Sequence, residues 1–244
     1  MRHIYVISVF PELIRDFINY GVLKKGQDKS LINIETINLR DFSDKNGYVD
    51  DKPYGGGACM FLQAQPLIDA TRYVKSKLKN YKCIYLSPKG KKVNQEMIVK
   101  TAKNDNLIII AGRYEGVDQR FIDLEVDEEW SIGDYILSGG EVAACVIIDA
   151  VARMIPGVLG HEDSNKEESF TNGYLEYPHY TRPEKVEGKN VPTVLLSVNH
   201  EELIVWLEKH ALLVPNNNRH YLLNTTHTSK FYIRYPLFSH YRIT

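Results

Sequence analysis

Three glycine-containing segments have the composition of ligand-binding loops. They read LSPKG at residues 86–90, GRYEG at residues 112–116 and WSIGDYILSGG at residues 130–140, and each follows a strand-like stretch. Loops at the carboxyl ends of parallel strands build the ligand crevice of an α/β sheet, and glycines let backbone groups approach an adenine and a ribose closely. Each segment alone also fits an ordinary tight turn. The three together favour a binding site.

A second group of side chains is suited to proton transfer and charge stabilisation. It comprises Asp50, Asp51, Tyr54, Glu115, Arg153, Glu167, Glu168, His179 and Arg182. Several of these residues could also have a purely structural role. Asp149 and Arg153 have the spacing of a helical ion pair, and the two aspartates at 50 and 51 fit the start of a turn. Glu167 and Glu168 lie in a charged stretch where solvated carboxylates are common, and His179 could be a structural histidine.

Familiar nucleotide and metal motifs are absent from the sequence. It contains no G-x-G-x-x-G segment after a strand, no phosphate-binding P-loop, no H-E-x-x-H pair and no zinc-type spacing of cysteine and histidine. The sequence therefore disfavours a Rossmann cofactor site. Its three cysteines form no C-x-x-C pair, which indicates a reducing environment and a cytoplasmic protein.

Charge and hydrophobicity limit the partners of the chain. A formal net charge of -1 over 244 residues exerts little attraction on a polyanion, so an RNA partner requires a local basic patch. Lys24, Lys25, Lys29, Lys89, Lys91 and Lys92 are candidates for phosphate contacts, although each also fits a solvated face. The N-terminus lacks the features of a signal peptide, and the apolar segment 142–156 is shorter than the roughly 20 residues of a membrane span. We expect no membrane partner.

Apolar periodicity predicts alternating strands and helices in the first two thirds of the chain. Strands are expected at residues 3–9, 31–39, 82–86 and 107–111, and helices at 11–20, 65–78, 94–103 and 141–155. The alternation, with continuously apolar strands, predicts an α/β domain with a parallel sheet covered on both faces. Residues 40–60 read as a long irregular loop around a triple glycine, and loops of that length are often functional.

The same reading divides the chain into two domains. Residues 1–160 form the predicted α/β domain, residues 161–172 a linker rich in charge and small residues, and residues 173–244 a smaller domain with a helix at 200–213. Residues 214–244 show neither a helical nor a strand period and are atypical.

Several segments together resemble the bacterial tRNA (guanine-37-N1) methyltransferase family, TrmD. They lie at residues 49–57, 85–88, 112–116, 127–140, 155–160 and 178–183, in family order and spacing, and the resemblance runs from residue 1 to about 202. It implies a SPOUT-type catalytic domain with a deep trefoil knot, an exception to the rule that chains are unknotted. It also implies a small, mostly helical C-terminal domain that binds tRNA, and a homodimer with the active site at the subunit interface.

The resemblance assigns roles to the residues of the loops. It places S-adenosylmethionine against Tyr85, Leu86, Ser87, Pro88, Gly112, Tyr114, Gly116, Ser131, Ile132, Gly133, Asp134, Tyr135, Ile136, Leu137, Gly139 and Gly140. It places the guanine substrate against Asp50, Tyr54, Gly55 and His179. Glu115 matches a family glutamate linked to substrate placement and to a requirement for magnesium, so Mg²⁺ is expected for activity, with no metal ligands identified.

The reaction explains why a carboxylate and an arginine are needed. N1 of guanine carries a proton that a base must remove before N1 attacks the methyl group, and the negative charge that then develops on O6 is stabilised by a cation such as Arg153. The family's base is an aspartate in an E-D-S-F pattern, and here Glu168 occupies its position in Glu167-Glu168-Ser169-Phe170. Glu176 replaces a second aspartate that assists the base. A shift of about 1 Å at a reacting centre costs on the order of a hundredfold in rate, so reduced activity is an expected consequence.

Departures from the family pattern leave a second hypothesis open. Ala58, Cys59 and Ala143 are tolerable packing changes, but no R-R-P motif follows residue 200 and residues 214–244 look unrelated to the family. The alternative to an enzyme is therefore an RNA- or cofactor-binding relative weakened by Glu168 and by its tail. A knotted methyltransferase acting on ribose or ribosomal RNA would not explain the triple-glycine loop together with Arg153 and Glu168.

Overall fold

The computed structural model describes residues 1–44, 46–57, 59–104, 106–160, 169–170, 175–197 and 199–218. The chain forms two compact units, Met1–Asn165 and Lys166–Thr244. No helix among the described residues is both long enough and apolar enough to cross a membrane.

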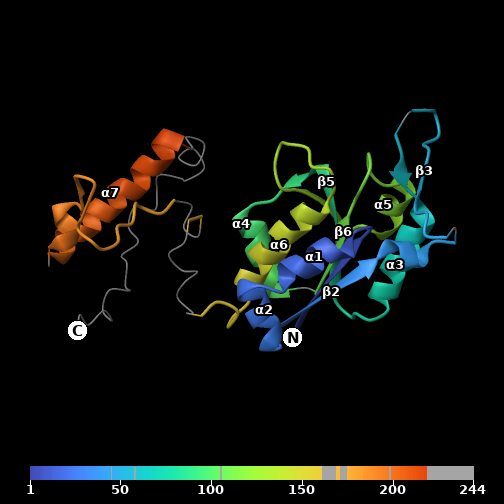
Figure 1. Ribbon diagram of the computed structural model, residues 1–244, viewed down its shortest axis with the longest axis horizontal. Coiled ribbons are helices and arrows are strands. Elements are labelled where there is room, and N and C mark those ends of the chain that lie inside the picture. The colour runs from blue at the N-terminus through green and yellow to red at the C-terminus, as the bar shows by residue number, and fades with distance from the viewer. Residues whose placement is uncertain are drawn as a thin grey trace. The chain divides into compact units, whose positions relative to one another are not determined.

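The first unit is built on a five-stranded sheet whose strands are all parallel (Figure 1). The strands are β1 (Arg2–Ser8), β2 (Ile32–Asn38), β5 (Tyr81–Lys92), β6 (Asn106–Ala111) and β7 (Glu128–Ser131), in the spatial order β2-β1-β6-β5-β7. The central strands consist of β-branched and other apolar residues, which suit a sheet that is buried on both faces. The predicted α/β class with a parallel sheet is confirmed.

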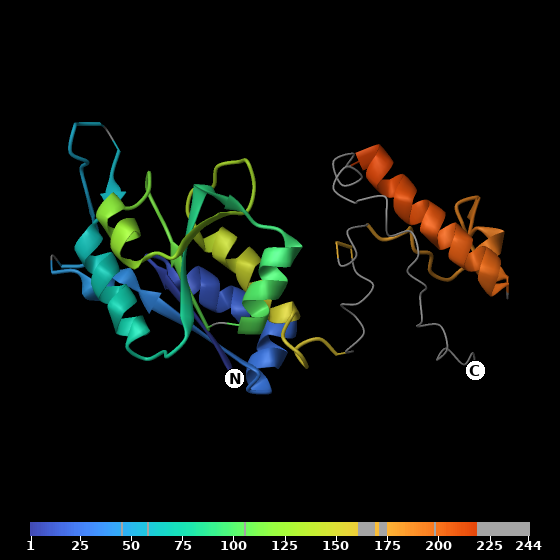
Figure 2. The ribbon, with the colours of Figure 1, turned by 180° about the vertical axis from the view of Figure 1, so that it is seen from behind.

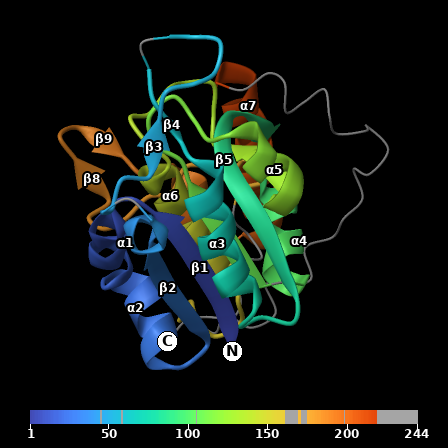
Figure 3. The same cartoon turned by 90° about the vertical axis from the view of Figure 1, so that its right-hand side faces the viewer.

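Helices cover both faces of this sheet. The helices α1 (Pro11–Ile18), α2 (Gly21–Asp28), α4 (Gln95–Asn104) and α6 (Glu141–Arg153) share one hydrophobic cluster with one face of the strands. The helices α3 (Ala64–Lys75) and α5 (Gln119–Glu125) and the 3-10 helix η1 (Leu39–Phe42) contribute to a second cluster on the other face. Figure 3 shows α1 and α2 side by side, and Figure 2 shows α3 beside α5.

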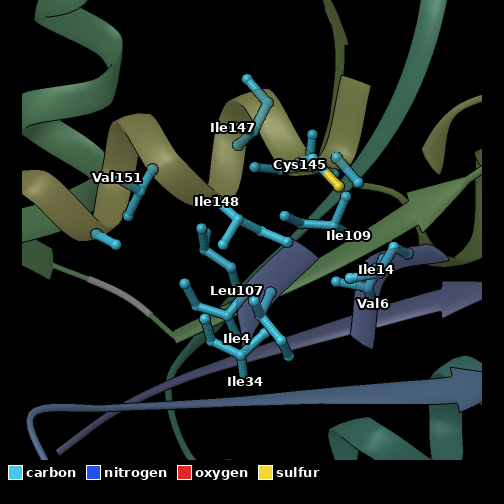
Figure 4. Packing of buried hydrophobic residues seen from close by; sticks show 14 of the residues in the cluster. Ile4, Val6, Ile14, Ile34, Leu107, Ile109, Cys145, Ile147, Ile148 and Val151 are labelled. Carbon is cyan, nitrogen blue, oxygen red and sulfur yellow. The ribbon is translucent and has the colours of Figure 1, made fainter. Parts of the chain in front are cut away.

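The first cluster is centred on α6, which is apolar around most of its circumference. Ile147, Ile148 and Val151 of α6 are almost fully buried, and Figure 4 shows Ile148 beside the strand residues Leu107 and Ile109. Alternate residues of each strand point to opposite faces, so Ile4 and Val6 join this cluster whereas Tyr5 and Ile7 join the other. Packing on both faces fixes the carboxyl edge of the sheet.

Three local features differ from the sequence-based expectation. A single helix was expected at 11–20, but the chain turns at Gly21, whose φ is +59°, and starts α2 there. Strand β5 continues beyond Ser87-Pro88 with a register shift against β7, and the segment 40–60 contains η1 and the strand β3 (Asp50–Asp51), which pairs with β4 (Phe61–Leu62). The segment is therefore not wholly irregular.

The second unit contains short elements and one long helix. The strands β8 (Lys185–Val186) and β9 (Lys189–Asn190) pair as an antiparallel hairpin, followed by η2 (Thr193–Leu196) and α7 (His200–Asn218). The helix expected at 200–213 is confirmed and extends further. Most of the predicted linker at 161–172 and all of residues 219–244 lie outside the described residues, so the predicted domain boundaries stay predictions.

The hydrophobic cluster on the α3 and α5 side gives a prediction about stability. Phe121 of α5 is fully buried, so Phe121→Ala leaves a cavity that lowers the free energy of unfolding by about 3–5 kcal/mol. Leu124 on the same helix is 62% exposed, and Leu124→Ala is the matched control, with an expected change within about 0.5 kcal/mol. Chemical denaturation measures both. Equal losses in the two variants would contradict the assigned packing.

Candidate active site

A cavity of about 180 Å³ lies at the carboxyl ends of β6 and β7 and beside the register shift of β5. All but one of the residues predicted to bind the cofactor line its wall. The exception is Asp134, whose exposed carboxylate pairs with Lys92 at 2.8 Å. Arg113, Trp130 and Ala143 line the cavity too and were not in the predicted set. The three glycine-containing segments, far apart in sequence, therefore meet at one place.

The backbone of two of these segments comes into direct contact. The amide of Gly140 donates a hydrogen bond to the carbonyl of Gly112 at 2.8 Å, and Arg113 and Gly139 form an isolated antiparallel bridge. A Cβ atom at Gly140 would lie 2.8 Å from Cα of Ala111, a distance that real Cβ atoms do not reach. Only glycine permits this approach between the end of β6 and the start of α6.

The rest of the wall is mostly uncharged. Burial raises the pKa of Tyr85 to about 12, so its phenol stays neutral at physiological pH. Ser131 closes a small turn by donating from Oγ to the carbonyl of Gly133 at 3.1 Å. The neighbouring Trp130 is 1% exposed and donates to Glu128 at 2.7 Å. These contacts hold the wall in place without a ligand.

The triple-glycine segment contacts the loop 112–116, the middle loop of the cavity wall. Tyr114, with a φ of 58°, donates from its hydroxyl to Asp50 at 3.1 Å, and the amide of Glu115 donates to the carbonyl of Met60 at 3.2 Å. Burial and the Asp50 carboxylate raise the pKa of Tyr114. Of the predicted substrate residues in this segment, Asp50 thus lies beside the cavity. Tyr54 is 99% exposed, and its neighbour Gly55 has a φ of +88°.

Glu115 lines the cavity and also contacts the exposed Cys59. The thiol is hydrogen-bonded to the Glu115 carboxylate, and this bond and the negative charge raise the pKa of Cys59. The described residues contain no group of three or more histidine, cysteine, aspartate or glutamate side chains placed to hold a metal ion.

Of the predicted catalytic residues, Glu115 lines the cavity and Arg153 is not among the residues of its wall. Arg153 is the last residue of α6, whereas Gly140 and Ala143 at the other end of this helix line the cavity. At 1.5 Å per residue, Arg153 lies about 18 Å along the axis from Glu141. Glu167 and Glu168 lie outside the described residues.

The remaining members of the predicted polar set belong to the second unit. His179 Nε2 lies 3.6 Å from a carboxylate oxygen of Glu176, and the ring of His179 lies 4.7 Å from that of Tyr177. The amide of Glu176 donates to Ser169 Oγ at 3.1 Å. Arg182 is exposed. Glu176 and His179, predicted for different roles, are thus neighbours.

Sequence reasoning missed a charged pair at the edge of the cavity. Arg113 Nε lies 2.9 Å from Glu141, whose side chain is 1% exposed. Glu141 reads in the sequence as an ordinary acidic residue of the first helical turn. The only sequence signal was its place directly after the Gly139-Gly140 pair, in a helix that is otherwise strongly apolar.

Fold and cavity together define an α/β protein with a ligand site at the carboxyl edge of a parallel sheet, and comparison with known proteins gives its family. The family model described as tRNA (Guanine-1)-methyltransferase TrmD matches residues 1–225. The chain belongs to this family. The match passes residue 202 and includes residues 214–225, which had looked unrelated to the family.

Curated relatives agree with this family. A protein of Buchnera aphidicola subsp. Schizaphis graminum named tRNA (guanine-N(1)-)-methyltransferase is 52% identical over 208 residues, which cover 85% of this chain and 79% of the relative. The protein of that name from Photorhabdus laumondii is 52% identical over 85% of this chain and 84% of its own length. The one from Pseudoalteromonas atlantica is 48% identical over 90% and 83%.

The contact between Glu115 and Cys59 predicts the reactivity of the thiol. Glu115→Gln removes the negative charge that raises the pKa of Cys59, so the thiolate fraction at pH 7.5 increases and the thiol reacts faster. The rate of reaction with a disulfide reagent measures this. Cys83 and Cys145 are buried, so Cys59→Ser removes the fast phase and is the control. An unchanged or slower rate in Glu115→Gln would show that the two groups are not in contact.

Proposed function

We propose that this chain transfers a methyl group from S-adenosylmethionine to N1 of guanine 37, next to the anticodon in tRNA. The observation that carries the proposal is the cavity in which the glycine-containing segments of a TrmD family member meet. The names of the relatives, tRNA (guanine-N(1)-)-methyltransferase, support the same reaction.

The cavity suits S-adenosylmethionine in its chemistry. Its wall includes the backbone of five glycines, the apolar side chains of Leu86, Ile132 and Ile136, and the neutral phenol of Tyr85. Such a wall accepts an adenosine through backbone hydrogen bonds and apolar contacts. When bound, S-adenosylmethionine supplies an electrophilic methyl group on a sulfonium. The carboxylate of Glu115 at the cavity edge is suited to favour a positive charge nearby.

The chain's own residues handle the proton and the charge of the guanine. Glu168 is the proposed base that removes the N1 proton, and Glu176 assists it, with its carboxylate 3.6 Å from His179. Arg153 stabilises the negative charge that develops on O6. Asp50, beside the cavity, and Tyr54 and Gly55 of the same segment contact the guanine. Mg²⁺ is proposed as a requirement for activity, on the match of Glu115 to the family's glutamate, and no ligands are assigned to it.

The position of Arg153 supports a homodimer. Arg153 lies ten residues, or about 15 Å along the axis of α6, from Ala143 in the cavity wall of the same chain, so we assign the arginine that acts there to a second copy. The exposed side of α6 carries Val142 and Val146, and the neighbouring α1 exposes Leu13 and Phe17. Exposed apolar side chains on adjacent helices are typical of a protein interface. We therefore place the active site between two subunits.

The remaining parts of the proposal concern the chain's organisation. Residues 1–160 form the catalytic domain, whose SPOUT-type trefoil knot holds the three loops in register, residues 161–172 a linker, and residues 173–244 the tRNA-binding domain. The reducing cytoplasm, where tRNA is modified, fits the free state of Cys59, Cys83 and Cys145.

Methylation of a tRNA transcript tests the function directly. The purified full chain, S-adenosylmethionine and Mg²⁺ should give N1-methylguanosine at position 37, detected by mass spectrometry of digested RNA. Arg153→Ala and Glu168→Ala should reduce turnover by about 10²-fold or more, as expected for lost charge stabilisation and lost base catalysis. Both variants should retain affinity for S-adenosylmethionine in calorimetry, because neither side chain is assigned to the cofactor.

Two controls separate this proposal from its alternatives. A transcript with another base at position 37 should remain unmethylated, and a persistent product would identify a different target nucleoside. If the chain binds S-adenosylmethionine but leaves the native transcript unmethylated, it is a binding relative and the enzyme proposal fails. Weakened cofactor binding in both variants would refute the roles of Arg153 and Glu168.

The proposed interface predicts the effect of a charge on α6. Val146→Glu places a carboxylate on the exposed apolar side of the helix, and its desolvation in the interface should convert the dimer to monomers without activity. Sedimentation at micromolar concentration measures the mass. Leu124→Glu, at an exposed position of α5, should leave the dimer intact. A wild-type chain that is monomeric while it methylates tRNA would contradict the proposal.

A further inference from the structure

We propose that Arg113 and the buried Glu141 and Ser8 form a positioning network that holds two loops of the cavity, 112–116 and 131–140, in the geometry that binds the cofactor. The inference rests on the proposed function, because it assumes that this cavity binds S-adenosylmethionine. It assigns the three side chains to positioning and none of them to the chemical step.

The network starts on β1 and ends at the middle loop. Ser8, the last residue of β1, is 1% exposed, and its Oγ donates to one carboxylate oxygen of Glu141 at 2.8 Å. The other carboxylate oxygen lies 2.9 Å from Nε of Arg113. The same Ser8 Oγ accepts the amide of Phe10 at 2.9 Å. One buried carboxylate therefore joins the first strand, the start of α6 and the loop after β6.

Arg113 also contacts the loop 131–140, the long loop of the cavity wall. Its Nη1 donates to the carbonyl of Ser138 at 3.2 Å, and its guanidinium carbon lies 4.5 Å from the ring centre of Phe10. The backbone bridge to Gly139 and the hydrogen bond from Gly140 to Gly112 lie directly beside it. Its Nε and Nη1 thus face Glu141 and the loop backbone, an arrangement that suits a support for the cavity wall.

Two physical arguments show why the loops need such a support. Ile136 of the long loop is 80% exposed and Tyr135 is 54% exposed, so this part of the loop gains little from core packing. Its far end is fixed where Glu141 begins α6. A carboxylate with 1% exposure is strongly destabilising unless it is paired, so Glu141 requires Arg113 and thereby draws the middle loop against the long one. Its place in the first helical turn also favours the negative charge.

Affinity for S-adenosylmethionine tests the network. Arg113→Gln and Glu141→Gln should each raise the dissociation constant by about tenfold or more in calorimetry. Because the two residues act as one unit, the double variant should bind as tightly as the single variant that has the lower affinity. In tRNA methylation, the KM for S-adenosylmethionine should rise while kcat at saturating cofactor stays within about threefold of wild type, which is the signature of lost binding without lost chemistry.

Three further variants keep the test decisive. Ser8→Ala does not alter the cavity wall, so the expected rise of about threefold in the dissociation constant must pass through Glu141. Arg113→Lys retains the charge and should recover part of the affinity. Arg120→Gln removes an exposed partner of Asp118, on α5 outside the cavity wall, and should leave the affinity unchanged. Thermal unfolding without cofactor identifies any variant that fails to fold. If Arg113→Gln or Glu141→Gln fails to fold, the dissociation constants of Ser8→Ala and Arg113→Lys test the network instead.

The outcomes distinguish the two levels of the proposal. A wild-type chain that does not bind S-adenosylmethionine would sink the proposed function itself. If the wild type binds and the Ser8, Arg113 and Glu141 variants bind equally well, the function stands and the network is overturned. If the increases in the dissociation constant of the two single variants multiply in the double variant, Arg113 and Glu141 act separately, and the network is also overturned.

Discussion

The cavity depends on one close approach of backbone to backbone. The end of β6 and the start of α6 lie so near each other that a Cβ atom at Gly140 would overlap Ala111. This approach brings the segments 112–116 and 131–140 into hydrogen-bonding contact, and β5, the neighbour of both β6 and β7, supplies the third segment. The helix α6 and the strand β6 share the first hydrophobic cluster, which fixes one against the other.

Helix α6 links the site to the proposed assembly. Its first residue, Glu141, is buried at the edge of the cavity and paired with Arg113, and its last residue, Arg153, lies at the opposite end of the helix. The side between them exposes Val142 and Val146. The same helix thus contacts the loops of the cavity and, in the proposed dimer, presents an arginine to the neighbouring subunit.

Much of this arrangement could be predicted from the sequence, for reasons visible in particular elements. Strand β6 is apolar from Leu107 to Ala111 and α6 is mostly apolar, and such patterns fit few other structures. The glycine segments meet because the strands β5, β6 and β7, which contain or precede them, are neighbours in the sheet. The continuation of β5 past Pro88 was missed. Proline lacks a backbone donor, but β6 pairs with β5 only as far as Leu86, so Pro88 breaks no bond on that side.

Other features depend on contacts that no local pattern encodes. Gly21 reads as the end of a helix, and the structure uses its positive φ to start another one. The bond between Ser8 and Glu141 joins residues 133 positions apart, and neither residue belongs to a recognisable motif. The distance of Arg153 from the cavity depends on the length of α6, which a list of reactive residues does not contain.

A crystal structure of the full chain with bound S-adenosylmethionine tests the central claim most directly. The account predicts electron density for the adenosyl group between residues 85–88, 112–116 and 131–140, with Arg153 of a second subunit approaching the methyl group. Density at another part of the sheet edge, or a cavity that stays empty while the ligand binds elsewhere, would contradict the account.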